Sequence, residues 1–286
     1  MSGFNRISDL VDAEKSSRSY SWRKVPNQVT TAGVWFDISS SAGNPAPKFW
    51  FDATPLTSKQ VAQSTDGGFF HGSDVSPYTK YLRKLMLMQV QSAGVLPMPV
   101  VVCDYLMYYP TIGEDTTDEQ FLSNPVSLPR YTDGEGVMAL ALSVAARTGG
   151  QSFFINYTNS AGVAGRISKT VKQNGLAVTG SVVTSGLAVV GQAGLFIPLQ
   201  NGDTGIRSIE SVTMLGVDVG LFSLVLVKPL ADTMIRGVDA PVEIDFFLDK
   251  KEMPIIEDDA FLSALIMPSG SITGVAINGT IKTIFN

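Results

Sequence analysis

The clearest pattern of apolar and polar positions lies in residues 196–230. Within it, residues 211–214 (SVTM) alternate polar and apolar side chains, which predicts a β-strand with one face exposed to water. The run Leu224–Val227 is wholly apolar and predicts a strand covered on both faces. Asn201-Gly202-Asp203 supplies a turn before the first strand, and Pro229, which lacks an N–H, is expected to end the second. We expect these two strands to form a β-hairpin in a packed sheet.

Similar segments recur along the rest of the chain. From Gly33 onward, short apolar or alternating runs are separated by Gly, Pro and Asn turns at intervals of roughly 8 to 12 residues, the spacing typical of sandwiches and barrels. We therefore predict an all-β fold, a jelly-roll-like β-sandwich, with residues 33–250 as its main domain. Residues 251–286 are expected to form a C-terminal β-hairpin that packs on this domain.

Residues 1–32 have a different pattern and are predicted to form a short N-terminal arm, helical and then extended. Ile7, Leu10 and Val11 have the spacing of one helix face, and Ser8 could cap that helix. The first 24 residues include five basic and three acidic side chains, an excess of two positive charges on an acidic protein. Such an arm is often ordered only against a neighbouring molecule, and a solvated leader is an equally supported alternative.

The composition favours a protein whose surface is covered by other molecules. Charged residues make up 16% of the 286 residues, against about 25% in an average soluble domain, and hydrophobic residues make up 44%. Because so few charges remain for a monomer's surface, we expect much of that surface to contact other subunits. The alternative is a monomer whose surface is rich in Ser, Thr and Asn.

Charge and targeting signals exclude several classes of protein. The net charge is −5 and the pI is about 4.9, so a phosphate backbone would be repelled on average and we expect no direct binding of nucleic acid. The opening MSGFNRISDL lacks the apolar region of a signal peptide, and no apolar stretch is long and unbroken enough to span a membrane. Cys103 is the single cysteine and is expected to be a buried thiol in a protein made in a reducing cytosol.

Candidate catalytic and metal-binding residues are few. His71 is the only histidine, which excludes a two-histidine or three-histidine metal site. Its neighbours Ser73 and Asp74 are unsuited to a catalytic triad, whose members are rarely adjacent in sequence, so we expect a turn histidine bonded to backbone groups. The acidic loop Gly113–Glu119 lacks the register of an EF-hand, and Asp258-Asp259 lacks a partner motif. We expect a solvated loop and a charged turn.

Two further patterns resemble binding motifs but lack the surrounding structure that those motifs require. Gly134–Ala139 (GEGVMA) matches a degenerate dinucleotide-binding motif but precedes a strand-like run and not a helix. A sugar-binding platform could draw on a cluster of aromatic residues: Trp35, Phe36, Phe49, Trp50 and Phe51. Trp35, Phe49 and Phe51 fall on inward strand positions, so we expect core packing instead. We therefore predict a protein that is not an enzyme and that has no cofactor and no metal.

Several segments resemble a family of virion structural proteins of tailed double-stranded DNA bacteriophages. From the leader to about residue 230 they are SDLVDA, GVWFDISSSAGNP, FFHGSDVSPYTKYL, CDYLMYYPTI, LPRYTDGEGVMA, INYTNSAGVAGR, GLFIPLQNGDTGIRSIESV and LVLVKPL. The family has no defined catalytic site, so the resemblance implies none here. It implies a β-rich protein incorporated into the particle as a decoration or cement protein of the head surface, with a tail or connector position as the alternative.

The resemblance and the residue pattern together define the expected partners. We expect copies of the chain to form a homotrimer and to contact the major capsid protein or another virion protein, in a particle made in the cytoplasm of a bacterial host. The predicted contact residues combine basic groups with aromatic anchors: Arg18, Tyr20, Trp22, Arg23 and Lys24. Two alternative functions are a glycan-binding host-attachment module, which predicts a shallow groove with exposed aromatics, and a hydrolase using His71 or the acidic clusters.

Overall fold

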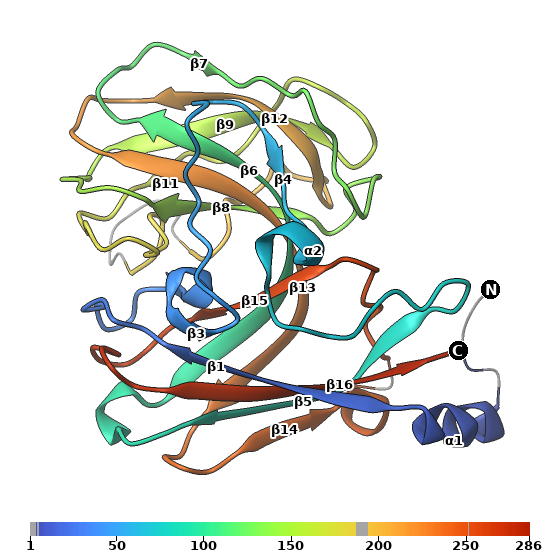
Figure 1. Cartoon of the computed structure of the whole chain (residues 1–286). Coiled ribbons are helices and arrows are strands. Elements are labelled where there is room, and N and C mark those ends of the chain that lie inside the picture. The colour runs from blue at the N-terminus through green and yellow to red at the C-terminus, as the bar shows by residue number, and fades with distance from the viewer. Residues whose placement is uncertain (1–3, 5, 187–193, 251) are drawn as a thin grey trace.

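The computed structural model describes residues 4, 6–186, 194–250 and 252–286, and antiparallel β-strands dominate it (Figure 1). They form three sheets. Sheet 1 consists, in spatial order, of β14 (Val242–Asp245), β5 (Lys80–Gln89), β16 (Ile277–Phe285), β1 (Arg18–Val25) and β3 (Ala42–Asn44). Sheet 2 consists of β2 (Phe36–Asp37), β15 (Phe261–Ile266), β6 (Met98–Gly113), β13 (Leu221–Ile235) and β8 (Met138–Ser143), with β4 (Lys59–Gln60) also paired to β6. Sheet 3 consists of β10 (Arg166–Ile167), β9 (Ser152–Asn159), β12 (Ile206–Met214) and β7 (Gln120–Phe121), with β11 (Val171–Lys172) also paired to β9.

Helices are short and lie outside the sheets. The α-helices are α1 (Ile7–Lys15) and α2 (Gln63–Asp66), and the other helical turns are η1 (Ile38–Ser40), η2 (Ala93–Val95) and the π-helical η3 (Phe246–Lys250). The helix expected from the spacing of Ile7, Leu10 and Val11 is confirmed as α1. Within the described part of the chain, no helix is both long enough and apolar enough to cross a membrane.

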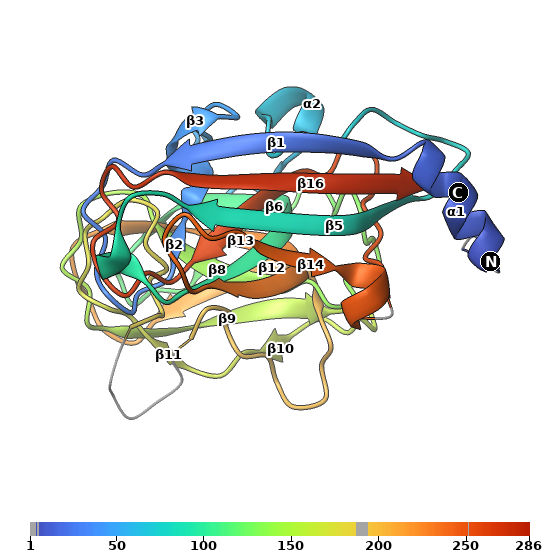
Figure 2. The same ribbon diagram turned by 90° about the horizontal axis from the view of Figure 1, so that it is seen from below.

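The long strands β6 and β13 connect the two halves of the molecule. Figure 1 shows them extending from the group containing β7, β9 and β12 to the group containing β1, β5 and β16. One half of β6, including Val100 and Val102, packs in a core with sheet 1. Its other half, including Leu106 and Tyr109, packs in a second core with sheet 3. In Figure 2 the strands β1, β16 and β5 lie side by side as one layer over this central sheet.

A third core covers other residues of the same central strands. Cys103, Tyr105 and Val225 pack there with Trp50 and Phe261. Cys103 is fully buried, as expected for a structural thiol, and burial raises its pKa well above the ordinary value for cysteine. Because residues of β6 and β13 pack in three cores, these strands are almost wholly apolar and buried along their centres.

The expected all-β sandwich is confirmed, but its strand pairing differs from that predicted in two places. A jelly roll has two sheets, whereas the described residues form three. The predicted hairpin is wrong, because β12 belongs to sheet 3 and β13 to sheet 2. Val212 of β12 and Leu224 of β13 lie in the same core. The inward-facing positions were thus predicted correctly, but the two strands pack face to face across this core and do not pair edge to edge. The predicted C-terminal hairpin is also replaced, since β15 pairs with β6 and β16 pairs with β5.

Two predicted boundaries shift for identifiable reasons. Pro229 does not end β13, because a register shift between Pro229 and Ala231 accommodates it within the strand. The predicted arm is not separate from the main domain either. Strand β1 pairs with β16 along Arg18–Lys24 and with β3, so sheet 1 is completed by segments from both ends of the chain.

A buried ion pair stands on β6 between the first two cores. The carboxylate of Asp104 is fully buried and accepts two hydrogen bonds from Arg130, Nε–Oδ2 at 2.8 Å and Nη2–Oδ1 at 2.7 Å. The backbone N–H of Phe261 donates a third at 3.1 Å. The Arg130 side chain also donates to the carbonyl oxygens of Val61 and Tyr105, at 3.2 and 3.0 Å. Burial raises the pKa of Asp104 to about 6, against the opposing effect of Arg130.

We expect Arg130→Met to lower the free energy of unfolding by about 3–5 kcal/mol, because it leaves the Asp104 carboxylate buried without its cation. Urea unfolding followed by tryptophan fluorescence measures the change. Arg23→Met is the matched control: the Arg23 side chain is exposed, and its replacement is expected to change stability by no more than about 0.5 kcal/mol. Equal effects of the two substitutions would contradict a stabilising role for the buried pair.

Candidate interaction surface of the N-terminal segment

Helix α1 is attached to sheet 1 by one apolar face. Leu10 and Ala13 are buried and form a small cluster with Tyr81 of β5 and Ile284 of β16. At the start of the helix, Asp9 accepts a hydrogen bond from the backbone N–H of Arg6 at 3.0 Å, which satisfies a donor that the helix itself leaves free. The expected cap Ser8 lies inside the helix, and Arg6 occupies the capping position.

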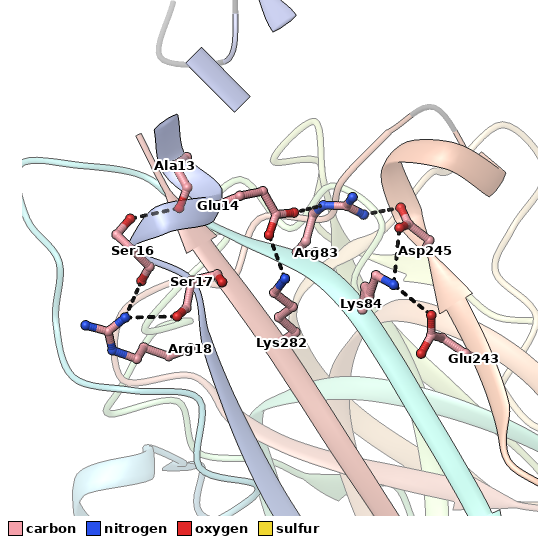
Figure 3. A network of polar contacts seen from close by, with 10 residues as sticks. All are labelled: Ala13, Glu14, Ser16, Ser17, Arg18, Arg83, Lys84, Glu243, Asp245 and Lys282. Carbon is pink, nitrogen blue, oxygen red and sulfur yellow. Dashed lines mark hydrogen bonds and ion pairs between the residues drawn. The ribbon is translucent and has the colours of Figure 1, made fainter. Parts of the chain in front are cut away.

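A chain of ion pairs fixes the end of α1 to three strands (Figure 3). Glu14 accepts hydrogen bonds from Arg83 Nε and Lys282 Nζ, each at 2.6 Å. Arg83 continues the chain to Asp245, and Lys84 bridges Asp245 and Glu243 at 3.6 and 2.7 Å. Burial raises the pKa of Glu14, but the bonds from Lys282 and Arg83 outweigh it and hold that pKa below its ordinary value. No sequence pattern predicts this network, because Arg83 is 69 residues from Glu14 and 162 from Asp245.

Strand β1 alternates between a buried and an exposed side, and this separates the five predicted contact residues. Trp22 and Lys24 are buried, Arg18 and Arg23 are exposed, and Tyr20 is half-buried. Trp22 and Lys24 are therefore unavailable to a partner in this conformation, which corrects the prediction for those two. The contact prediction is thereby reduced to Arg18, Tyr20 and Arg23.

Trp22 is a core residue that requires a glycine opposite it in β16. Its ring stacks on Phe69, with centroids 3.9 Å apart and planes 3° from parallel. Across the strand pair, Trp22 lies opposite Gly279, where an added Cβ would come within 2.2 Å of the indole. Glycine at this position lets the ring lie flat on the sheet.

Lys24 is buried as a cation held by backbone carbonyls. Its Nζ donates to the oxygens of Ser39 and Ser41, each at 3.1 Å, and of Ala46 at 3.4 Å. Burial lowers the pKa of Lys24 to about 8, and the nearby Asp37 acts in the opposite direction. Lys24 therefore fixes the course of the segment around η1 and β3 and does not offer a charge to solvent.

The three remaining predicted residues do not form one patch. Arg18 donates to the carbonyl oxygens of Ser16 and Ser17, at 3.1 and 2.9 Å, just after α1. The ring of Tyr20 meets Phe70 edge to face at 5.0 Å. Arg23 projects from the outer face of sheet 1 and lines a shallow hollow of about 300 Å³. Basic groups thus occur both beside the helix and at the far end of the strand.

The outer face of sheet 1 carries basic side chains, of which Lys84 and Lys282 are paired with acidic groups. Its rows follow the strand register, with Arg23 opposite Asn278, Ser21 opposite Thr280, and Ser19 opposite Lys282. In β5, Lys84 lies opposite Lys282. On α1, Ile7 is 76% exposed and Val11 is 55% exposed, one turn apart. The exposed part of the N-terminal segment therefore combines an aliphatic pair with basic side chains.

His71 is a buried structural histidine. Its Nε2 lies 2.9 Å from the carbonyl oxygen of Ala260, and because a carbonyl only accepts, Nε2 carries the hydrogen. Its Nδ1 lies 3.4 Å from Nζ of Lys80 and accepts from it. Both ring nitrogens are thus occupied, while Ser73 and Asp74 are exposed. Burial, with the positive charges of Lys80 and Arg130, lowers the pKa of His71 to about 4. The expected turn histidine bonded to backbone groups is only partly matched, because His71 lies outside a turn and one of its two partners is the Lys80 side chain.

The acidic segments are partly structural. Glu114, from the loop expected to be solvated, is fully buried and forms an ion pair with buried Arg147 at 2.7 Å. Asp258 pairs with Lys80 at 3.3 Å, and Asp259 accepts from Ser64. Among the described residues, no group of three or more His, Cys, Asp or Glu side chains could hold a metal ion.

Of the three aromatic residues expected in the core, Trp35 packs half-buried against the third core, whereas Phe49 and Phe51 point outward. Phe49 and Phe51 are 42% and 58% exposed, with ring centroids 5.8 Å apart, whereas Trp50 between them is buried. The Trp50 indole donates to Asp37 at 2.5 Å, and Tyr105 donates to the same carboxylate at 2.9 Å. The buried carboxylate therefore selects the indole as the inward side chain.

Comparison with known proteins does not assign this chain to a family. No family model matches it, and no curated protein matches it. Among solved structures, it is similar to the infectious bursal disease virus Gt strain structure, with 11% identity, a TM-score of 0.21, and coverage of 94% of this chain and 80% of that one. A VP2 subviral particle of the same virus gives 11% identity, a TM-score of 0.20 and the same coverages. At these TM-scores the likeness carries no argument about function.

We expect His71 to make stability fall as pH decreases from about 6.5 to 4. Over that range the unfolded chain takes up a proton at an ordinary histidine, but the folded chain does not, since its pKa is about 4. The loss is about 3 kcal/mol and is complete near the folded pKa. Urea unfolding at several pH values, with wild type compared against His71→Gln, measures it. Asp104 titrates in the same range with the opposite sign, so the difference between the two proteins isolates His71. Parallel curves would contradict the assignment.

Proposed function

We propose that the protein is a non-enzymatic structural component of a virus particle, and specifically a decoration or cement protein on the capsid surface of a tailed bacteriophage. The sequence segments that resemble virion proteins of these phages support the proposal, and so does the all-β sandwich. Its location is then the virion, with synthesis in the bacterial cytoplasm. Many weak contacts on a symmetric shell add up to stable attachment.

The observation that carries the proposal is the number of large apolar side chains left on the surface. Those that are more than half exposed are Ile7, Val11, Val29, Phe51, Phe70, Tyr78, Phe121, Val163, Ile167, Leu215, Val217, Val219 and Leu248. They come from the helix, from loops and from edge strands, so one small ligand could not cover them. A multi-subunit particle covers several such surfaces at once.

Within this proposal, α1 and β1 form the contact with an unlike neighbour. Ile7 and Val11 supply apolar area, and Arg18 and Arg23 supply positive charge toward an acidic subunit. The network through Glu14 holds the helix on sheet 1, so the contact is ordered in advance and little entropy is lost on binding. The homotrimer expected from the sequence stays a prediction.

One observation favours a second function. Phe49 and Phe51 present two exposed rings on the surface, a feature that a glycan-binding host-attachment module needs. Their planes are tilted by 31°, so they do not form one flat platform. Binding on a glycan array that is lost in Phe51→Ala would favour this function, and a tail or connector position would appear directly in images of the particle.

We expect Ile7→Glu/Val11→Glu to leave the fold intact and to prevent incorporation into particles, because two carboxylates replace the apolar contact on α1. The measurement is the amount of tagged protein that sediments with purified particles, together with cryo-electron microscopy of those particles. Deleting residues 1–25 would not test the contact, because the deletion also removes β1 from sheet 1.

Val163→Glu/Ile167→Glu is the control, because these side chains are each 51% exposed and lie near β10 at the edge of sheet 3. It is expected to be incorporated like wild type. Equal incorporation of both double variants would overturn the α1 contact. Absence of the wild-type protein from the particle would overturn the proposed function itself.

A further inference from the structure

The half of β13 that follows Lys228 has one edge without a strand partner. Strand β8 pairs with β13 only from Phe222 to Val227. Beyond that point β13 continues to Ile235 and pairs with β6 on one side alone. In the part of the chain that the structure describes, no backbone hydrogen bond reaches the other side of residues 229–235. Such an edge offers a row of free donors and acceptors.

The pairing of Pro99 shows which residues of β13 face the open side. The carbonyl oxygen of Pro99 accepts from the backbone N–H of Met267 at 2.9 Å, so the backbone polar groups of Pro99 point toward β15. Pro99 lies opposite Met234 in β13, and this pair is therefore one without mutual hydrogen bonds. Met234 consequently points its N–H and C=O away from β6. Asp232, two residues earlier, does the same.

The open edge borders two hollows, which residues of β14, η3 and the segment after η3 also line. One hollow of about 790 Å³ lies along residues 228–232, and another of about 820 Å³ lies along residues 232–237. Asp232 and Lys250 line both. The second hollow is also lined by Trp35 and Val101, so it has an apolar surface on which Met234 can pack.

The residues along this edge are self-complementary in charge. Asp232, Met234 and Arg236 alternate with the core residues Ala231 and Ile235, so their side chains share the outward face. Asp232 and Arg236 are exposed, and none of the ion pairs among the described residues uses either.

We propose that two copies of the chain pair through these edges as antiparallel strands about a two-fold axis at Met234. In this register each Asp232 lies opposite the Arg236 of the other copy, and the two methionines lie side by side over the hollows. Both copies use the same surface, as a closed two-fold contact requires. The inference does not rest on the proposed function.

The charge pattern distinguishes this register from its neighbours. Centring the axis on Asp232 would put two carboxylates opposite each other, which is destabilising in an antiparallel pair. Edge strands that are protected against pairing carry charges that repel a second copy. Here Asp232 and Arg236, on the two sides of Met234, carry opposite charges. In the proposed register they therefore attract the second copy.

Sedimentation velocity of the purified full-length chain over a range of concentrations tests the pairing. We expect wild type to form dimers, and Asp232→Arg or Arg236→Asp alone to weaken the dimer by about tenfold or more, because each turns two attractive cross-strand pairs into two repulsive ones. The double variant Asp232→Arg/Arg236→Asp restores the opposite charges and is expected to restore dimers. Asp118→Arg, the same charge change at an exposed position in the acidic loop, is the matched control and should behave like wild type.

Hydrogen exchange gives a second readout that loss of folding would not imitate. The amides of Asp232 and Met234 are expected to exchange slowly in wild type and fast in each single variant, while amides in the cores stay protected in all of them. A wild-type chain that stays monomeric would overturn the proposal. So would dimers that are indifferent to both single reversals, or a double variant that fails to recover.

Discussion

The structure depends on the buried ion pair between Asp104 and Arg130. Strand β6 contributes to a core with sheet 1 at one end and to a core with sheet 3 at the other, and Asp104 lies at the boundary between them. A charge at this position must be compensated, and the guanidinium does so while also bonding to the carbonyls of Val61 and Tyr105. One side chain thereby holds the loop that follows β7, the entry to α2 and the central strand in a fixed relation. The pair therefore stabilises the junction between the two halves that β6 and β13 connect.

The burial of charged side chains elsewhere in the interior helps to explain why few charges remain on the surface. The chain has 21 basic and 26 acidic residues, and several of them are buried: Lys24, Asp37, Lys80, Arg83, Asp104, Glu114, Arg130, Arg147 and Asp245. These side chains hold loops to sheets through ion pairs and carbonyl contacts, as Lys24 and Arg147 do. Each charge placed inside is one fewer on a surface that already has few. That surface also carries exposed aliphatic and aromatic side chains, which the proposed particle contacts would cover.

The sequence allowed the fold class to be predicted but not the pairing of strands. Alternation shows which side chains share a face, yet two strands with matching apolar faces can lie side by side or face each other across a core. The pair β12 and β13 takes the second arrangement, with residues 215–220 crossing between the sheets. In the candidate site the extended segment after the helix was predicted, but the burial of Lys24 was not, because its carbonyl partners come from residues 39–46. Phe49 and Phe51 were placed inward for a similar reason, since the Asp37 carboxylate that attracts Trp50 lies in another segment.

The two proposed association surfaces suit different partners and could be occupied together. The surface on α1 and β1 has basic charge and a small aliphatic pair, which fits an acidic neighbour of another kind. The edge of β13 is complementary to itself, which fits a second copy. They share no residue, and one lies on sheet 1 while the other lies at the edge of sheet 2. A closed two-fold contact uses one edge from each copy and cannot propagate into a filament. If both proposals hold, the two-fold contact joins copies in pairs while each α1 attaches to the shell, so a surface protein of this kind could link neighbouring subunits without forming fibres of its own.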